Sequence, residues 1–314
     1  MRTQSSAARE SLGYTSKDRP TVSRPLVITG AAGQLGQTLV ESLAGEWRTV
    51  GLTRRDLDVT DGREVLRTMA DLKPCAIVNC SAFNAVDRAE DEPEESFHVN
   101  ALAVANLARA AEAAGATLVH YSSDFVFDGE TDRPYREEDA PRPRGTYAAS
   151  KLVGEWLARD AADHYVLRVE SLFGGVYKLT SSVDRIIEAL QSGTTVPVFL
   201  DRVVSPSYVV DVASATAHLL RCRAPVGVYH CVNTGSCTWL QLGEEIARQL
   251  HVEASLQPIR MSELPLRAPR PRYGALSNEK LRLTGCEMPT WQSALQRHLA
   301  RYQAGARTRD TDIS

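Results

Sequence analysis

The chain alternates short apolar runs with longer segments of helical spacing. The apolar, β-branched runs of the first half occupy residues 26–29, 49–52, 76–78, 117–120 and 165–167. Each is followed by a longer segment in which apolar residues recur three and four positions apart, most clearly over 34–44, 99–114 and 148–159. A strand followed by a helix, several times over, predicts an α/β fold with a doubly wound parallel sheet.

This alternation loosens beyond residue 172, which predicts a smaller second lobe. Its expected strands are 196–200, 203–207 and 228–232, and its expected helices are 182–190, 208–221, 240–250 and 291–302. We assign 25–172 to a nucleotide-binding domain whose core also receives later strands, and 173–302 mainly to a substrate-binding lobe. Residues 1–24 and 303–314 lack an apolar pattern and are predicted to be disordered tails.

Composition narrows the class of partner. Hydrophobic residues make up 43% of the 314 positions, and 36 basic against 39 acidic residues give a net charge of −3. This composition is typical of a globular protein. The near balance of charges does not favour nucleic acid or an anionic membrane as a partner. No apolar run is long enough for a membrane span or a secretion signal, so we expect a cytoplasmic protein that binds small molecules. The six cysteines show no metal or disulfide spacing and are expected to be free thiols.

A glycine pattern directly after the first strand indicates a dinucleotide site. Gly30, Gly33 and Gly36 form a GxxGxxG turn that leads into the helix predicted at 34–44. Glycines allow a tight turn and close approach of the backbone, and the helix N-terminus offers N–H groups to a pyrophosphate. The sheet is therefore predicted to be of the Rossmann type.

The end of the second strand bears on the choice of cofactor. NAD-binding folds usually place an acid there, but this chain has Arg54 and Arg55. A guanidinium suits the 2'-phosphate of NADPH. NADH stays open, because the arginines could form a solvated basic turn beside Asp56 and Asp58.

Two further features predict catalysis. Tyr147 and Lys151 are four residues apart on a predicted helix, so both side chains leave the same face. A nearby ammonium lowers the pKa of a phenol and prepares it for proton exchange. Ser123 follows the fourth strand, at the sheet edge where parallel sheets bind their ligands. Hydroxyl, phenol and ammonium would then converge beside a nicotinamide.

Together these features resemble the extended short-chain dehydrogenase/reductase superfamily, and more narrowly the dTDP-4-dehydrorhamnose reductase family. The resemblance covers 25–302. The segments that carry it are GAAGQLG (30–36), DLDVTD (56–61), NCSAF (79–83), AVDRAE (85–90), VNA (99–101), SSDFVFDG (122–129), VYHC (228–231) and APRP (268–271).

The resemblance implies an oxidoreductase that reduces the C4 ketone of a nucleotide-linked, dTDP-type 6-deoxysugar with NADPH, as in L-rhamnose biosynthesis. Tyr147 would protonate the alkoxide, Lys151 would bind the nicotinamide ribose and acidify Tyr147, and Ser123 would bond the carbonyl oxygen. The cofactor residues carried over, with Arg54, Tyr147 and Lys151, are Gly30, Gly33, Gln34, Leu35, Gly36, Asp58, Val59, Ser81, Ala82, Phe83 and Asn100.

The sugar side departs from the family pattern. The family segment RTSWVYG corresponds to RVESLFG here, so Ser171 replaces a tryptophan that would face the sugar. Arg202 stands where the family has glutamine, and could meet a diphosphate or form a salt bridge. The substrate contacts that we predict are Asp124, Phe125, Glu170, Ser171, Arg202 and Arg272.

Several alternatives stay open at this point. A dehydratase is disfavoured because Phe125 replaces the required glutamate, but a nucleotide-sugar epimerase or a non-catalytic, cofactor-binding regulatory subunit could use the same scaffold. The acidic residues between Glu90 and Glu95 are most simply a solvated helix start. No metal is assigned, and a homodimer is left open.

Overall fold

The large domain is organised around one parallel sheet. The computed structural model describes residues 24–175 and 181–311. Six strands pair in the order β10-β5-β4-β3-β1-β2, all parallel. Their bounds are β1 Leu26–Thr29, β2 Thr49–Leu52, β3 Ala76–Asn79, β4 Thr117–Ser123, β5 His164–Val169 and β10 Gly227–His230. The predicted doubly wound sheet is thereby confirmed.

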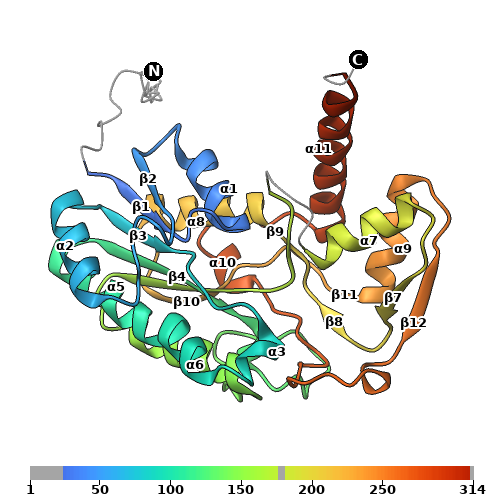
Figure 1. The fold of residues 1–314 in the computed structure, drawn as a ribbon, viewed down its shortest axis with the longest axis horizontal. Coiled ribbons are helices and arrows are strands. Elements are labelled where there is room, and N and C mark those ends of the chain that lie inside the picture. Colours follow the sequence, from blue (N-terminus) through green and yellow to red (C-terminus); the bar gives the residue numbers. More distant parts are fainter. Residues whose placement is uncertain (1–23, 176–180, 312–314) are drawn as a thin grey trace, which may run out of the picture.

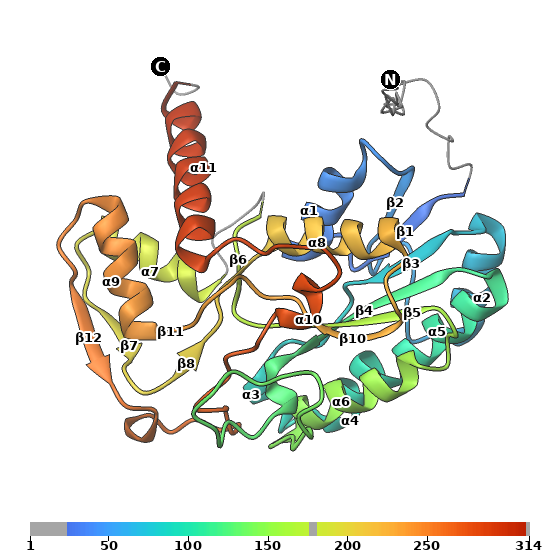
Figure 2. The same ribbon diagram turned by 180° about the vertical axis from the view of Figure 1, so that it is seen from behind.

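Helices cover both faces of this sheet (Figures 1 and 2). Because successive side chains of a strand point to opposite faces, Leu26 and Ile28 pack on one side and Val27 on the other. The first face is covered by α1 (Gln34–Leu43) and α8 (Val209–Cys222). The second face is covered by α2 (Gly62–Leu72), α5 (Ala103–Ala114) and α6 (Thr146–Ala158). Both faces are buried, as an all-parallel sheet requires.

The smaller lobe has its own core. Three helices, α7 (Ser182–Gln191), α9 (Trp239–Leu250) and α11 (Trp291–Thr311), pack around short strand pairs. The pairs are β7 (Val196–Phe199) with β12 (Leu256–Ile259), β8 (Val203–Val204) with β11 (Cys237–Thr238), and β6 (Leu172–Phe173) with β9 (Ser207–Tyr208). The lobe stands beside the edge of the sheet where β4 and β5 end (Figure 1).

Several short elements complete the fold. They are α3 (Val86–Ala89), α4 (Pro93–Phe97), α10 (Glu279–Arg282), the 3-10 turns Asp124–Val126 and Met261–Glu263, and a π-helical turn at His98–Leu102. The π-helical turn divides the helix that we predicted over 99–114. Such a wider turn often marks a functional region, and here it directs Asn100 toward the loop that follows β3.

The chain crosses between the large domain and the smaller lobe several times after residue 172. The chain returns from the smaller lobe to the large domain with α8 and β10, so these late elements belong to the sheet core. Helix α2 was not predicted because its apolar face is narrow, with only Val65 and Met69 buried. The Asp61 carboxylate caps it by accepting hydrogen bonds from Arg63 N and Glu64 N.

Both predicted tails need a corrected boundary. Arg24 belongs to the fold, because its guanidinium donates to the carbonyl oxygens of Lys73, Pro74 and Ala114 at 3.1, 2.5 and 2.6 Å. Residues 1–23 lie outside the described residues. At the other end α11 continues to Thr311 instead of ending at 302. Extending an existing helix costs little, since each added residue closes one more backbone hydrogen bond.

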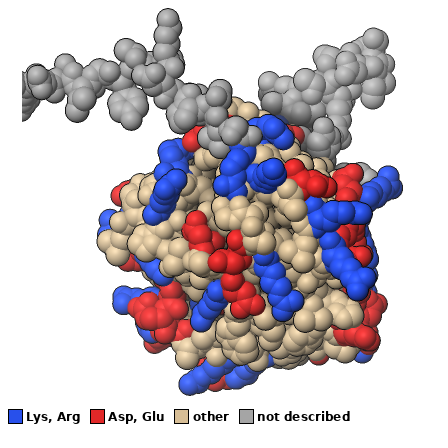
Figure 3. Space-filling model, turned by 90° about the vertical axis from the view of Figure 1, so that its left-hand side faces the viewer, with Lys and Arg blue, Asp and Glu red and all other residues tan. Residues whose placement is uncertain are grey.

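The surface carries charges of both signs. Lysine and arginine side chains are interspersed with acidic ones over the face shown in Figure 3. In the described part of the chain, no helix is long and apolar enough to cross a bilayer.

Candidate active site

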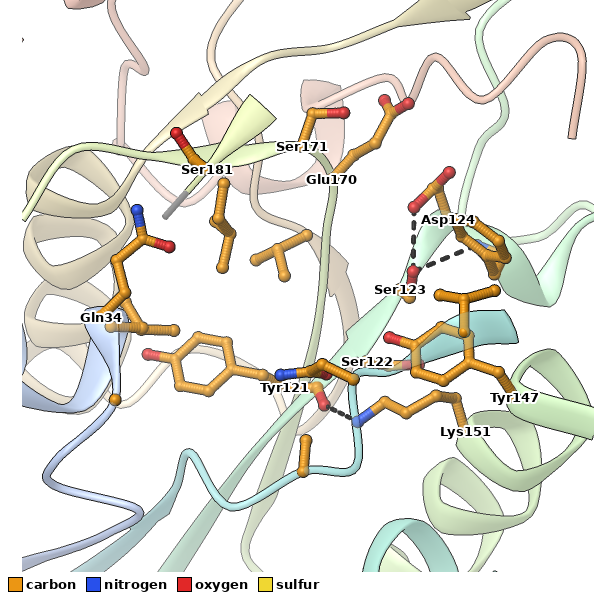
Figure 4. Close-up of a pocket in the computed structure, with 18 of the residues that line it drawn as sticks. Gln34, Tyr121, Ser122, Ser123, Asp124, Tyr147, Lys151, Glu170, Ser171 and Ser181 are labelled. Carbon is orange, nitrogen blue, oxygen red and sulfur yellow. Dashed lines mark hydrogen bonds between the residues drawn. The ribbon is translucent and has the colours of Figure 1, made fainter. Parts of the chain in front are cut away.

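A cavity of about 470 Å³ lies at the carboxyl edge of the sheet, facing the smaller lobe (Figure 4). It extends from the glycine turn, past the ends of β3, β4 and β5, to side chains of the smaller lobe. The predicted site residues that line it are Gly33, Gln34, Leu35, Gly36, Ser81, Ala82, Ser123, Asp124, Phe125, Tyr147, Lys151, Glu170, Ser171 and Arg202.

The glycine turn is shaped for close backbone approach. Gly30 has φ +66°, and a Cβ there would stand 2.6 Å from the carbonyl carbon of Cys80. At Gly36 a Cβ would overlap the carbonyl oxygen of Gly30. Gly33 caps α1 without any side-chain acceptor, which leaves the first turn open to an anionic ligand. This geometry fits a dinucleotide pyrophosphate, although Gly30 itself does not line the cavity.

Hydrogen bonds fix the neighbouring strand ends. The Gln34 amide donates to Gly174 O at 2.6 Å and so joins the start of α1 to the segment that follows β6. Asn79 Oδ1 accepts from Thr29 Oγ1 at 2.8 Å and from Ser81 N at 3.0 Å. The wall formed by Ser81 and Ala82 is therefore tied to the glycine turn.

The end of β2 lies beside the same turn, because Ala31 N donates to Leu52 O at 3.1 Å. The Arg54 side chain is 84% exposed and its guanidinium is 3.8 Å from the Glu95 carboxylate. Asp58 accepts from Thr60 N and Thr60 Oγ1, and its carboxylate forms a local turn. Arg54, Asp58 and Val59 lie outside the cavity described above, so their predicted contacts with the adenosine end stay predictions.

Two other predicted cofactor residues are structural neighbours of the cavity and do not line it. Asn100 is fully buried, accepts from Phe83 N at 2.9 Å and donates to Phe83 O at 3.1 Å. These bonds hold the backbone that follows Ser81 and Ala82. Phe83 packs against Tyr147 and Ala89. Asn100 and Phe83 therefore support the segment of the cavity lining that contains Ser81 and Ala82.

Helix α6 positions the predicted catalytic pair. Its cap residue Gly145 has no side chain, and Glu90 from another segment takes over the capping role. The Glu90 carboxylate accepts from Thr146 N at 2.7 Å and from Thr146 Oγ1 at 3.0 Å. Glu90 is thus engaged with α6, whereas Glu94 and Glu95 stand in the first turn of α4, as the interpretation as a solvated helix start predicts. Tyr147 and Lys151 then project from one face of α6 (Figure 4).

Lys151 is a buried cation whose ammonium group donates a hydrogen bond to a backbone carbonyl. Its Nζ donates to Tyr121 O at 2.6 Å. Burial lowers its pKa to about 8, while the nearby carboxylate of Glu155 and the Cys80 thiol oppose this shift. Glu155 is itself paired with the Arg168 guanidinium at 2.7 Å. The ammonium is therefore held in place and titrates close to neutrality.

Tyr147 is a neutral phenol in this setting. Burial and the charge of Asp124 raise its pKa above the ordinary value, while a hydrogen bond with Ser123 acts in the opposite direction. The Phe125 ring meets its edge at a centroid distance of 5.4 Å. A neutral phenol beside an ammonium is suited to give a proton to a developing oxyanion.

The sugar side of the cavity is rich in buried charge. Asp124, Glu170 and Arg202 converge there from β4, β5 and the loop after β7. Ser171 has φ +44°, a left-handed conformation that is uncommon for a residue with a side chain.

Arg272 is the one predicted substrate contact that does not line the cavity. Its side chain is exposed and lies outside the cavity, whereas Arg270, two residues earlier, lines it. Asp87 holds Arg270 there through hydrogen bonds of 2.6 and 3.0 Å. The APRP segment could have indicated Arg270, because its prolines restrict the loop, but the partner carboxylate was needed to decide which arginine points inward.

Other lining residues carried little or no signal in the sequence. Asn84, Ser181, Val183 and Trp239 also face the cavity. Trp239 begins α9, far along the chain, and only the packing of the lobe brings it to the site. These residues have no motif spacing that would mark them.

The cavity joins a dinucleotide-type turn to a serine, tyrosine and lysine set, which is the arrangement of an extended short-chain dehydrogenase/reductase. The model of the RmlD substrate binding domain family matches residues 24–304. A dTDP-4-dehydrorhamnose reductase of Streptomyces griseus is 36% identical over 86% of this chain and 91% of its own length. The chain therefore belongs to this reductase family.

Two further relatives add detail. A protein of Streptomyces antibioticus, described as a probable dTDP-4,6-dihydroxy-2-methyloxan-3-one 4-ketoreductase, is 35% identical over 86% of this chain and 92% of its own. The solved structure of a dTDP-4-dehydrorhamnose reductase from Bacillus anthracis in complex with NADP has a TM-score of 0.84 at 31% identity, covering 88% of this chain and 99% of that one. The predictions of family, Rossmann-type fold and nicotinamide-dependent oxidoreductase are confirmed.

Proposed function

We propose that this protein reduces the C4 ketone of a dTDP-linked 4-keto-6-deoxysugar with NADPH. The observation that carries the proposal is a single cavity with the glycine turn at one end and Ser123, Tyr147 and Lys151 further along it. The relatives named above support the substrate class, and the NADP complex of the Bacillus anthracis relative supports the cofactor.

Tyr147, Lys151 and Ser123 have different roles in the reduction. When bound, NADPH supplies the hydride. Tyr147 gives its phenol proton to the oxygen of the former ketone, and Lys151 stabilises the resulting phenolate by its positive charge. Ser123 turns its hydroxyl toward the carbonyl oxygen and orients the ketone. A site of this kind favours reduction, because Tyr147 is protonated before the substrate binds.

Substrate specificity would come from the sugar side of the cavity. Arg202 and Arg270 offer cationic groups for a diphosphate, and Ser171 leaves space against the sugar ring. We expect the enzyme to act in the cytoplasm in deoxysugar biosynthesis. Formation of a homodimer is a further prediction that size-exclusion chromatography with light scattering would test.

The decisive experiment incubates the purified full chain with NADPH and dTDP-4-keto-6-deoxyglucose, with and without a 3,5-epimerase. We expect oxidation of NADPH and a reduced dTDP-sugar, identified by nuclear magnetic resonance. Epimerised ketosugar without consumption of NADPH would indicate an epimerase. Tight binding of NADPH without any turnover would instead support the regulatory subunit.

A further inference from the structure

Two buried acids meet on the sugar side of the cavity without a donor between them. Asp124 and Glu170 are each 2% exposed. Asp124 Oδ2 and Glu170 Oε1 have no hydrogen-bond partner among the described residues. Both oxygens converge on Gly274, where a Cβ would stand 2.8 Å from the aspartate oxygen and 2.6 Å from the glutamate oxygen. The missing side chain at Gly274 leaves room for this approach.

The charges around the pair do not balance two carboxylates. Arg202 is the cation that faces both acids, and Arg270 beside it is committed to Asp87. The other groups that face the pair are neutral: Tyr147 and Ser123 near Asp124, and Ser205 N, Cys237 and Tyr273 near Glu170. A second buried negative charge without its own cation is costly, and taking up one proton removes that cost. Burial raises the pKa of Asp124 to about 6 and that of Glu170 well above its ordinary value.

Hydrogen bonds connect this pair to the catalytic phenol. Ser123 Oγ donates to Asp124 Oδ1 at 2.9 Å, and Tyr147 is hydrogen-bonded to Ser123. The labelled side chains lie in the order Glu170, Asp124, Ser123, Tyr147 along this side of the cavity (Figure 4). Ser205 N donates to the other oxygen of Glu170 at 2.5 Å and fixes its orientation.

We propose that Asp124 and Glu170 share one proton and pass it to Tyr147 through Ser123 after each reduction. This inference rests on the proposed function, in which Tyr147 has just become a phenolate. The Ser123 hydroxyl proton moves to the phenolate, and Ser123 Oγ takes the proton of the pair from Asp124 Oδ1, the oxygen that it already contacts. Glu170 stabilises the protonated form of Asp124 by its own negative charge. No heavy atom or electron pair leaves its residue, and the pair, now two carboxylates, takes its next proton from water. Asp124 and Glu170 act through Ser123 and are positioning residues for the proton.

The test compares the first turnover with later ones in the full chain, using Glu170→Gln, with NADPH and the ketosugar in excess. The readout is the ratio of the first-turnover rate to the later rate, because Tyr147 begins protonated and only later turnovers need the proton of the pair. Relative to the first, later turnovers should slow by about 10²- to 10⁴-fold, which is the range for one lost proton-transfer group. Small acids added as buffer should restore the later turnovers of this variant, which a purely structural role of Glu170 would not permit.

The pH profile gives a second readout. In wild type the steady-state rate should fall as pH rises through the titration of the acid pair, because only the protonated pair can give a proton to Ser123. Glu170→Gln should lose this decline and keep only the one above about pH 8 that belongs to Lys151. Glu137→Gln is the matched control, since Glu137 is also a partly buried carboxyl whose burial raises its pKa, and it lies against His230 N, away from Tyr147. It should retain the wild-type profile.

Infrared spectroscopy of the wild-type protein tests the shared proton without any turnover. A protonated-carboxyl band should be present near neutral pH and absent in Glu170→Gln. Absence of the band in wild type, or equal first and later turnovers in Glu170→Gln without a buffer effect, would overturn the proposal. A band in a wild-type protein that reduces no dTDP-ketosugar would reject the proposed function and leave the acid pair established.

Discussion

The two ends of the cavity are built in different ways. The cofactor end is formed by two short segments, residues 33–36 of the glycine turn and residues 79–82 at the end of β3. The sugar end is assembled from β4, β5, the loop after β7, the start of α9 and the loop that contains Arg270. Charged groups are absent from the lining of the glycine turn, whereas Asp124, Glu170 and Arg202 are buried on the sugar side.

This difference separates a general function from a specific one. A pyrophosphate needs free N–H groups and space, which a short glycine-rich turn supplies wherever it occurs. A particular sugar needs side chains placed on several rigid elements at once. Changes at the sugar end can therefore alter the substrate without altering the cofactor, and the reverse holds for the cofactor end.

The largest expected effect lies where the two ends meet. Tyr147→Phe removes the transferable proton and keeps the ring that packs against Phe125 and Phe83. Turnover should drop about 10²- to 10⁴-fold, since one general acid is lost. The affinity for NADPH, measured by fluorescence titration, should change little, because the glycine turn is untouched. Turnover close to that of wild type would remove Tyr147 from the mechanism.

The next effect is confined to the cofactor end. Replacing Arg54 and Arg55 together with alanine should weaken NADPH binding by about ten- to a hundredfold, the value of a charge-assisted contact, and leave NADH almost unchanged. Calorimetric titration with each cofactor measures the contrast. Arg48→Ala is the control, since this exposed arginine stands just before β2, at the end of the strand opposite to Arg54 and Arg55. Equal losses for both cofactors would indicate a damaged fold, and no loss would make the pair a solvated turn.

The comparison also explains what the sequence could predict. Strands β1 and β2 fall where the apolar runs place them, and the glycine turn follows from local spacing. The pair Tyr147 and Lys151 could be predicted from the sequence because residues four positions apart on one helix share a face. Each of these features depends on neighbours along the chain.

The features that the sequence left unresolved depend on distant partners. The Pro-rich loop holds both Arg270 and Arg272, and nothing in it reveals that Asp87, far earlier in the chain, holds Arg270 at the cavity. Glu90 caps α6 from a segment whose acidic composition looked solvated. Asp124 and Glu170 both approach Gly274, which lies 150 residues beyond the first acid and 104 beyond the second, and no spacing rule connects these positions.

An effect of intermediate size is the pH dependence of the reduction rate, which tests the role of Lys151 between the two ends of the cavity. Lys151 must be protonated to stabilise the phenolate, and burial lowers its pKa to about 8. The rate of reduction at saturating NADPH should therefore fall about tenfold per pH unit above that value, because the charged fraction falls in that proportion. Lys151→Gln should be slow and should lack this decline. The same decline in the glutamine variant would assign it to another group.

The smallest expected effect concerns the sugar end alone. Ser171 lines the cavity at a position where the family has a tryptophan, so the smaller side chain removes a broad apolar wall. Ser171→Trp should lower activity on the native sugar and raise the relative rate with dTDP-4-keto-L-rhamnose, by about tenfold in the ratio of kcat/KM values. NADPH affinity should not change, because Ser171 follows β5 and lies away from the glycine turn. Ser171→Asn is the matched control, since asparagine tolerates the left-handed backbone that Ser171 adopts at φ +44° without filling the pocket. Unchanged relative rates in a folded Ser171→Trp protein would show that the position only fills space, and rhamnose formation would then be the expected reaction.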